Sequence, residues 1–92
     1  MARGITLRRL GADDLAHLRS LNALFADAFE DPDTYASAPA TDAYLSTWLA
    51  KPHVIALAAF EGEAVVGGLV AYVLDKFEQA RAEVYIFDIA VA

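Results

Sequence analysis

The chain has 92 residues, no cysteine and a formal net charge of −6 at pH 7. The absence of cysteine excludes disulfide bonds and thiolate metal sites, and the length allows one small domain. The acidic balance argues against nucleic acids and anionic membranes as partners and favours cationic ligands.

Targeting and metal-binding features do not stand out in the sequence. No apolar run is long enough to span a bilayer, and the segment from Met1 to Leu10 lacks the apolar core of a signal peptide. His17 and His53 have no carboxylate at metal-ligand spacing, so we expect no metal site. The sequence favours a cytoplasmic protein that does not bind membranes.

The first third of the chain predicts a strand and a helix. Ile5–Leu10 alternates roughly between apolar and polar side chains, as a strand does, and Gly11 ends it. Asp13 or Asp14 can cap a helix that runs to about Phe29. Its apolar positions recur at helical spacing: Leu15, Leu18, Leu21, Leu24, Phe25, Ala28 and Phe29.

A loop and a second, shorter helix are expected next. Pro32 ends the first helix because proline cannot continue the hydrogen-bond ladder, and the small, polar stretch Thr34–Ala40 is expected to be a loop. Thr41 or Asp42 can cap the second helix, which ends before Pro52. Its apolar side chains are Tyr44, Leu45, Trp48 and Leu49.

Three strands fill the rest of the chain. His53–Phe60 is a nearly continuous apolar run, typical of a strand buried on both faces. A tight turn leads to Ala64–Leu74, in which Gly67-Gly68 indicates a bulge or a close backbone approach. Glu83–Val91 is the third apolar strand. The order β-α-α-β-β-β predicts an α/β (α+β) fold with a mainly antiparallel sheet and helices packed on it.

The last strand has the pattern of a central strand, yet no later element is present to cover it. An exposed apolar edge promotes association. We therefore expect residues 1–92 to be a fragment that pairs with another chain, either as a homodimer or with a C-terminal half that this sequence lacks.

A family resemblance is carried by the run from Ile55 to Ala92, IALAAFEGEAVVGGLVAYVLDKFEQARAEVYIFDIAVA. This run resembles the aminoglycoside 3-N-acetyltransferases of the GNAT (Gcn5-related N-acetyltransferase) superfamily. Its hairpin is similar to the second and third GNAT strands, and the KFEQ and EVYIFDIAV stretches are more specific. The segment LRRLGADDLAHLRSLNALFADAFEDPDTY resembles the opening of the same enzymes more loosely. The resemblance implies that residues 1–92 are the N-terminal portion of a single GNAT domain.

The implied activity is acetyl-CoA-dependent N-acetylation of the 3-amino group of an aminoglycoside antibiotic, which confers resistance. Acetylation removes a positive charge and so weakens attraction to RNA phosphates. GNAT enzymes hold the acetyl-CoA pyrophosphate in a glycine-rich loop that opens a helix, and this sequence contains no such loop. The chain alone is therefore expected to be inactive. Two alternatives are acetylation of another polyamine or small amine, and a non-catalytic, self-associating fragment.

Asp88 is the candidate catalytic residue. It is the only charge between Val84 and Ala92, in a strand where a carboxylate is costly unless it is paired or hydrogen-bonded. A carboxylate can take the proton of an attacking amine, and the resemblance puts the corresponding aspartate in the active site. The alternative is a carboxylate paired within the sheet or facing a loop.

The resemblance alone implies that Ile89, Ala90 and Val91 bind the pantetheine arm of acetyl-CoA through their backbone. One of their N–H groups would polarise the thioester carbonyl. Ordinary sheet pairing is the alternative for these three residues.

The candidate substrate-binding residues are mostly acidic. They are Glu30, Asp31, Asp33, Tyr35 and Glu78. The first three cluster at a helix C-terminus, where carboxylates oppose the helix dipole, so binding of a polycationic sugar would explain them. Glu78, together with Glu83, would extend this negative wall, and Tyr35 and Tyr72 would offer hydroxyls or a face for a sugar ring. Packing or solvent exposure accounts for these residues equally well.

Overall fold

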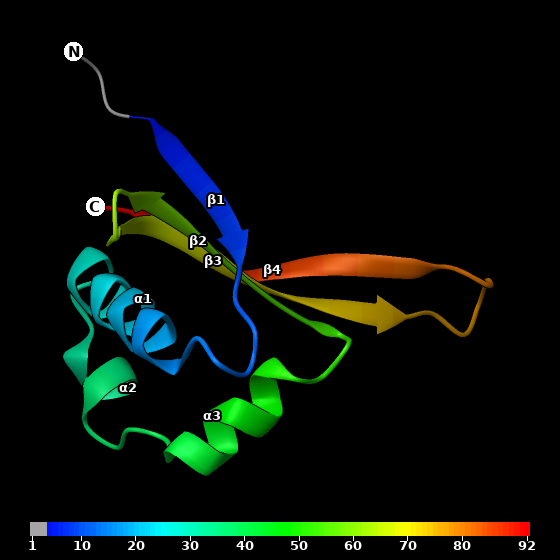
Figure 1. Ribbon diagram of the computed structural model, residues 1–92. Coiled ribbons are helices and arrows are strands. Elements are labelled where there is room, and N and C mark those ends of the chain that lie inside the picture. Colours follow the sequence, from blue (N-terminus) through cyan, green and yellow to red (C-terminus); the bar gives the residue numbers. More distant parts are fainter. Residues whose placement is uncertain (1–3) are drawn as a thin grey trace.

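A four-stranded antiparallel sheet, covered on one face by three helices, forms the structure (Figure 1). It is a computed structural model that describes residues 4–92. The strands follow one another across the sheet in chain order: β1 (Ile5–Arg9), β2 (Val54–Glu61), β3 (Ala64–Asp75) and β4 (Ala82–Val91). The helices are α1 (Leu15–Ala28), α2 (Pro32–Ala36) and α3 (Asp42–Leu49). The predicted α/β class with an antiparallel sheet is confirmed.

The core lies between α1 and the middle of the sheet. Leu18, Leu21 and Phe25 form the buried stripe of α1, as their spacing predicts. Leu21 and Phe25 pack with Val70 of β3, and Leu18 packs with buried residues of β2 and α3.

Among residues 4–92, no helix is both long and apolar enough to cross a membrane.

The starts of α2 and α3 follow capping chemistry, whereas Asp14 stands at the N-cap of α1 without a side-chain cap hydrogen bond. The Thr41 side chain caps α3 by accepting a hydrogen bond from the Tyr44 backbone N–H at 3.2 Å. The prediction of a loop from residue 34 was wrong at its start, because Pro32–Ala36 forms a helical turn. Pro32 occupies the first turn, where its fixed φ suits a helix, and the Asp31 carboxylate accepts from the Thr34 N–H at 3.2 Å. The proline that ends one helix therefore begins the next.

Gly67 and Gly68 mark both a bulge and a close approach. The β2–β3 register shifts between Ala59 and Phe60, which pair with Gly67 and Val65. A Cβ on Gly68 would lie 2.4 Å from the Leu57 carbonyl oxygen and 2.7 Å from Leu21 Cδ1. Glycine at this position therefore lets α1 pack directly on the sheet.

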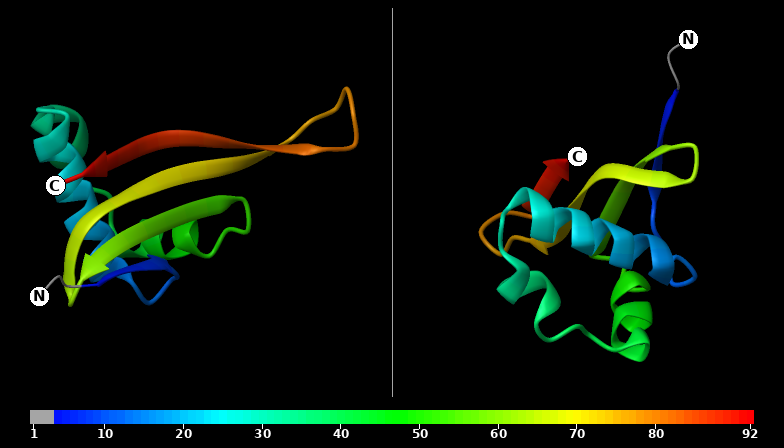
Figure 2. Two further views of the ribbon diagram at one scale, coloured as in Figure 1. Left: turned by 90° about the horizontal axis from the view of Figure 1, so that it is seen from above. Right: turned by 90° about the vertical axis from the view of Figure 1, so that its left-hand side faces the viewer.

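The β3–β4 hairpin extends beyond the helices as a long arm (Figure 2). Among the described residues, β4 is an edge strand, and most of its large side chains are exposed. These side chains are Val84, Tyr85, Ile86, Phe87, Ile89 and Val91.

Candidate active site

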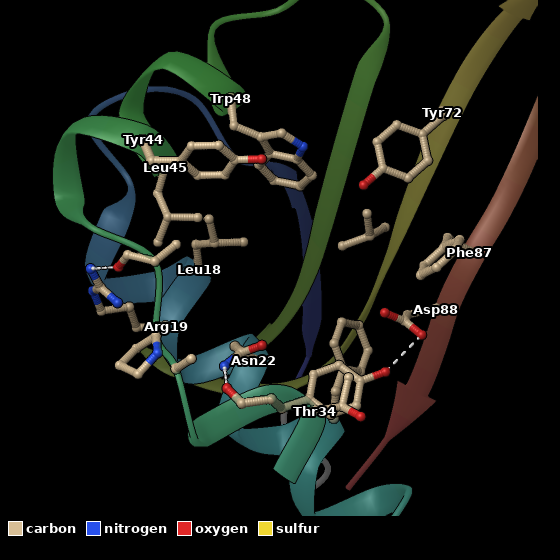
Figure 3. A pocket seen from close by; sticks show the side chains of 16 residues that line it. Leu18, Arg19, Asn22, Thr34, Tyr44, Leu45, Trp48, Tyr72, Phe87 and Asp88 are labelled. Carbon is tan, nitrogen blue, oxygen red and sulfur yellow. Dashed lines mark hydrogen bonds between the residues drawn. The ribbon is translucent and has the colours of Figure 1, made fainter. Parts of the chain in front are cut away.

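A cavity of about 340 Å³ lies where α1, α2 and α3 meet β3 and β4 (Figure 3). One side of the cavity is aromatic. The Tyr72 ring lies between the rings of Trp48 and Phe87 and meets both edge to face, with centroid distances of 6.3 Å to Trp48 and 6.0 Å to Phe87. The volume falls in the range of small-molecule sites, and the aromatic side offers apolar faces for a ring-shaped ligand.

A bulge in β4 brings two consecutive side chains to this cavity. Val70 pairs with Asp88 and Ala71 with Ile86, so Phe87 has no partner on β3. Successive side chains of a regular strand point to opposite faces, and one extra residue breaks that alternation. Phe87 and Asp88 consequently both line the cavity, where Figure 3 shows the Asp88 carboxylate.

Asp88 is held by a tyrosine from α2. The Tyr35 hydroxyl donates a hydrogen bond to Asp88 Oδ1 at 2.9 Å, between residues 53 positions apart. The Asn22 side-chain amide of α1 donates to the Tyr35 carbonyl oxygen at 2.6 Å and so fixes α2 against α1. Three elements therefore determine where the Asp88 carboxylate lies.

The Tyr35 hydroxyl stays protonated to high pH. The pKa of Tyr35 is raised from 10.0 to about 12, first by burial, then by the hydrogen bond to Asp88 and by the negative charges of Asp88 and Asp31. The pKa of Tyr35 is higher in the folded than in the unfolded protein. The contribution of its protonated hydroxyl to the stability of the fold is therefore fully present below pH 10. The stabilisation is lost as pH rises through about 12.

We expect Asp88→Asn to lower the pKa of Tyr35 from about 12 toward 10, because the substitution removes the negative charge that disfavours the phenolate. An NMR titration of ¹³C-labelled tyrosine measures this change. Asp75→Asn, at the far end of β3, is the control and should leave the pKa of Tyr35 unaltered. A Tyr35 pKa that is the same in Asp88→Asn and in the unaltered protein would contradict the contact between Tyr35 and Asp88.

The charges that line the cavity are Arg19 and Asp88. Arg19 donates to the Ala40 carbonyl oxygen at 3.0 Å and forms an ion pair with the Asp42 carboxylate. Within residues 4–92, the Asp88 carboxylate takes part in no ion pair, and the neutral Tyr35 is its only hydrogen-bond donor. The uncompensated charge of the cavity is therefore negative, which suits an amine.

The predicted acidic cluster lies beside the cavity rather than in it. Asp31 caps α2 and also accepts from the Thr34 hydroxyl at 2.7 Å. Asp33 is exposed in the first turn of α2, and Glu30 adopts a positive φ of 52° in the α1–α2 turn. None of these three carboxylates lines the cavity, whereas Tyr35 does.

Glu78 lies elsewhere, in the loop that joins β3 to β4 at the far end of the hairpin. Its carboxylate is 3.3 Å from Arg81 and 3.9 Å from Lys76. Asp75 and Ala82 are the paired residues nearest to this end of the hairpin, and Ala82 precedes Asp88 on β4 by six residues. Since a strand rises by about 3.3 Å per residue, roughly 20 Å of strand separates Asp88 from the end of the arm.

Ile89, Ala90 and Val91 form the last part of β4 beside the cavity. Ala90 is half-buried and packs on the cluster of Leu21, Phe25 and Val70, while Ile89 and Val91 are exposed. No strand pairs with the outer edge of β4 among residues 4–92. That edge offers backbone groups that an amide-bearing ligand could pair with.

Besides Asp88, Tyr35 and Tyr72, sequence reasoning assigned no role in a site to the residues that line the cavity. Asn22 interrupts the apolar stripe of α1 between Leu18 and Phe25, and a polar residue in such a stripe was the available signal. Arg19 and Phe87 carried no such signal, because their positions depend on the α2–α3 connection and on the β4 bulge.

The chain is similar to several proteins of known structure. No model of a known protein family and no curated protein matches the sequence. The chain is 43% identical, with a TM-score of 0.93, to an aminoglycoside acetyltransferase from an uncultured soil metagenomic sample, over 97% of this chain and 59% of that one.

Two further solved structures are similar to the chain. A second aminoglycoside acetyltransferase from an uncultured soil metagenomic sample, solved with sisomicin, is 28% identical at a TM-score of 0.85, over 95% of this chain and 55% of that one. A ribosomal-protein-alanine N-acetyltransferase from Brucella melitensis biovar Abortus 2308, 23% identical at a TM-score of 0.68, shares the fold over 96% of this chain and 56% of that one.

The chain thus spans little more than half the length of the proteins that it matches. The predicted resemblance is confirmed: over almost its whole length, the chain has the fold of the GNAT-type aminoglycoside acetyltransferases, and it is 43% and 28% identical to the two that are compared.

Proposed function

We propose that the protein carrying this chain transfers the acetyl group of acetyl-CoA to an amine of an aminoglycoside, at the 3-amino position, and so confers resistance to the antibiotic. The observation that carries this proposal is the Asp88 carboxylate, which has no cationic partner among residues 4–92 and lines a cavity with an aromatic side. The similarity to aminoglycoside acetyltransferases supports it.

Asp88 is the proposed general base. Acetyl-CoA, when bound, supplies an activated thioester. Asp88 accepts the proton that the neutral amine loses as its nitrogen bonds to the acetyl carbon, and the carbon–sulfur bond would break with CoA leaving as its thiolate. The Trp48, Tyr72 and Phe87 rings are proposed to pack against the sugar rings.

The outer edge of β4 is proposed to bind the cofactor. Ile89, Ala90 and Val91 would pair their backbone groups with the amides of the pantetheine arm, and one N–H would polarise the thioester carbonyl. This assignment is supported by the unpaired edge beside Asp88. The glycines of residues 4–92 form no glycine-rich loop that opens a helix, so the groups that hold the pyrophosphate are proposed to come from another segment.

We also propose that residues 1–92 are the N-terminal portion of a single GNAT domain. The match to 59% of an aminoglycoside acetyltransferase supports this proposal. The exposed side chains of β4 would then be covered by the rest of the domain or by a second copy of the chain.

The acidic cluster of Glu30, Asp31 and Asp33 lies outside the cavity lining, so its carboxylates can only attract a cationic substrate from a distance. Neutralising them is expected to remove this attraction and so to weaken substrate binding. The triple change Glu30→Gln, Asp31→Asn and Asp33→Asn keeps a residue that can cap α2. It should raise the aminoglycoside KM a few-fold at low salt and less at high salt, because salt screens exposed charges. Steady-state kinetics at two ionic strengths measure this.

The matched control is Glu61→Gln with Glu63→Gln, which removes exposed charges near the β2–β3 turn and should have a smaller effect. The KM for acetyl-CoA should stay constant in both variants. An aminoglycoside KM that is unaltered at low salt would mean that the cluster only caps α2.

One observation favours a second candidate, the acetylation of a smaller amine. The cavity holds about 340 Å³ and a single uncompensated carboxylate, which suffices for one amine group. An assay of CoA release with aminoglycosides and with linear polyamines separates the two candidates. The proposal predicts turnover of an aminoglycoside and an acetyl group on its 3-amino nitrogen by NMR. Turnover of linear amines alone would favour the second candidate.

A further inference from the structure

We propose that Tyr35 is a positioning residue, which holds the Asp88 carboxylate in place for catalysis rather than binding the substrate. The inference rests on the proposed function, because it assigns Tyr35 a role toward the proposed base. The hydrogen bond from the Tyr35 hydroxyl to Asp88 Oδ1, 2.9 Å long, is the observation that carries it.

The need for a positioning group arises from the bulge in β4. Asp88 follows Phe87, which has no partner on β3, so the ladder is interrupted directly before the carboxylate. An Asp side chain next to such an irregularity has freedom in its terminal torsion, which is broad for carboxylates. The Tyr35 hydroxyl removes that freedom by occupying one carboxylate oxygen, and the second oxygen stays available to an amine.

Tyr35 is itself firmly held. Its ring lies 6.1 Å from the Phe25 ring and 5.9 Å from the Phe29 ring, between centroids. Its carbonyl oxygen accepts the hydrogen bond from Asn22, and the helical turn that carries it is capped by Asp31. The hydroxyl is thus fixed by α1 and α2 before any ligand enters the cavity.

The protonation state of Tyr35 suits a hydrogen-bond donor to Asp88. Burial and Asp88 keep the pKa of Tyr35 at about 12, so the hydroxyl is protonated at neutral pH. The hydroxyl proton is already used on Asp88, so it is not available to a sugar oxygen. Donation from Tyr35 to a substrate oxygen would therefore have to break the Tyr35–Asp88 bond, whereas accepting from a substrate N–H or O–H would leave it intact.

Tyr35→Phe tests this role in the protein that carries the chain, because it removes the hydroxyl and keeps the ring. We expect kcat to fall by roughly tenfold, the loss that corresponds to one hydrogen bond to a charged group, with the aminoglycoside KM unchanged. Tyr85→Phe is the matched control, since Tyr85 lies on β4 outside the cavity lining and should leave kcat unaltered. A raised KM with constant kcat would assign Tyr35 to substrate binding and overturn the inference.

A double-variant cycle separates positioning from a structural effect. If Tyr35 acts through Asp88, adding Tyr35→Phe to a protein that already carries Asp88→Asn should not lower kcat any further. A second, multiplied loss in that background, or a lowered thermal midpoint that accounts for the lost activity, would overturn the inference. Full activity of Asp88→Asn alone would instead contradict the proposed function, so the two failures are distinct.

Discussion

Asp88→Asn is expected to lower kcat for acetyl transfer by about 10²–10⁴-fold, the contribution of a general base. Asparagine keeps the size of the side chain and can still accept the hydrogen bond from Tyr35, so the geometry of the cavity should persist. What is lost is the ability to take the proton of the attacking amine. Steady-state kinetics at neutral pH with acetyl-CoA and an aminoglycoside measure the effect.

The matched control for this prediction is Asp75→Asn, which makes the same chemical change at an exposed position on β3. Asp75 lies outside the cavity lining, so its replacement should leave kcat unaltered. Thermal unfolding should be similar for both variants and the parent protein. Near-normal turnover of Asp88→Asn would remove Asp88 from the role of base.

Gly68→Ala is expected to destabilise the fold by about 1–3 kcal/mol, the typical cost of adding a methyl group to a filled core. The new Cβ would lie 2.4 Å from the Leu57 carbonyl oxygen, a backbone atom, and 2.7 Å from Leu21 Cδ1. Leu21 is fully buried and the backbone of β2 is held in the sheet, so neither neighbour can move aside cheaply. Denaturant unfolding measures the free energy difference.

Gly11→Ala provides the control for Gly68→Ala. A Cβ on Gly11 would meet only Asp14 Oδ2, at 3.8 Å, which is an ordinary contact. Reduced freedom of the unfolded chain then makes this change neutral or slightly stabilising. Equal effects of the two substitutions would show that α1 does not pack on Gly68 as the structure has it.

Most of the fold could be predicted from the sequence, because its elements are specified locally. Apolar runs indicated the three C-terminal strands, and the spacing of Leu18, Leu21 and Phe25 indicated the buried face of α1. The helical turn of α2 was missed because Pro32 was interpreted only as a stop signal. Proline in a first turn is also a start signal, and the Asp31 cap decides between the two.

The site could be predicted only in part. Asp88 was identifiable as a lone charge in an apolar strand, since burying such a group requires a compensating interaction. Its partner was not identifiable, because the contact with Tyr35 depends on an irregularity of β4 and on how α2 packs against α1. In the sequence, Glu78 cannot be distinguished from the other acidic candidates for substrate binding. Its distance from the cavity depends on the length of the β3–β4 arm, which the structure shows.

A structure of the protein with a bound aminoglycoside tests the central claim most directly, since the claim is that the cavity beside Asp88 receives the amine that is acetylated. The account predicts an aminoglycoside amine nitrogen within about 3 Å of the Asp88 carboxylate, with the Tyr35 bond intact and the sugar rings against Trp48 and Tyr72. An aminoglycoside bound elsewhere on the protein, with no amine in contact with Asp88, would contradict it.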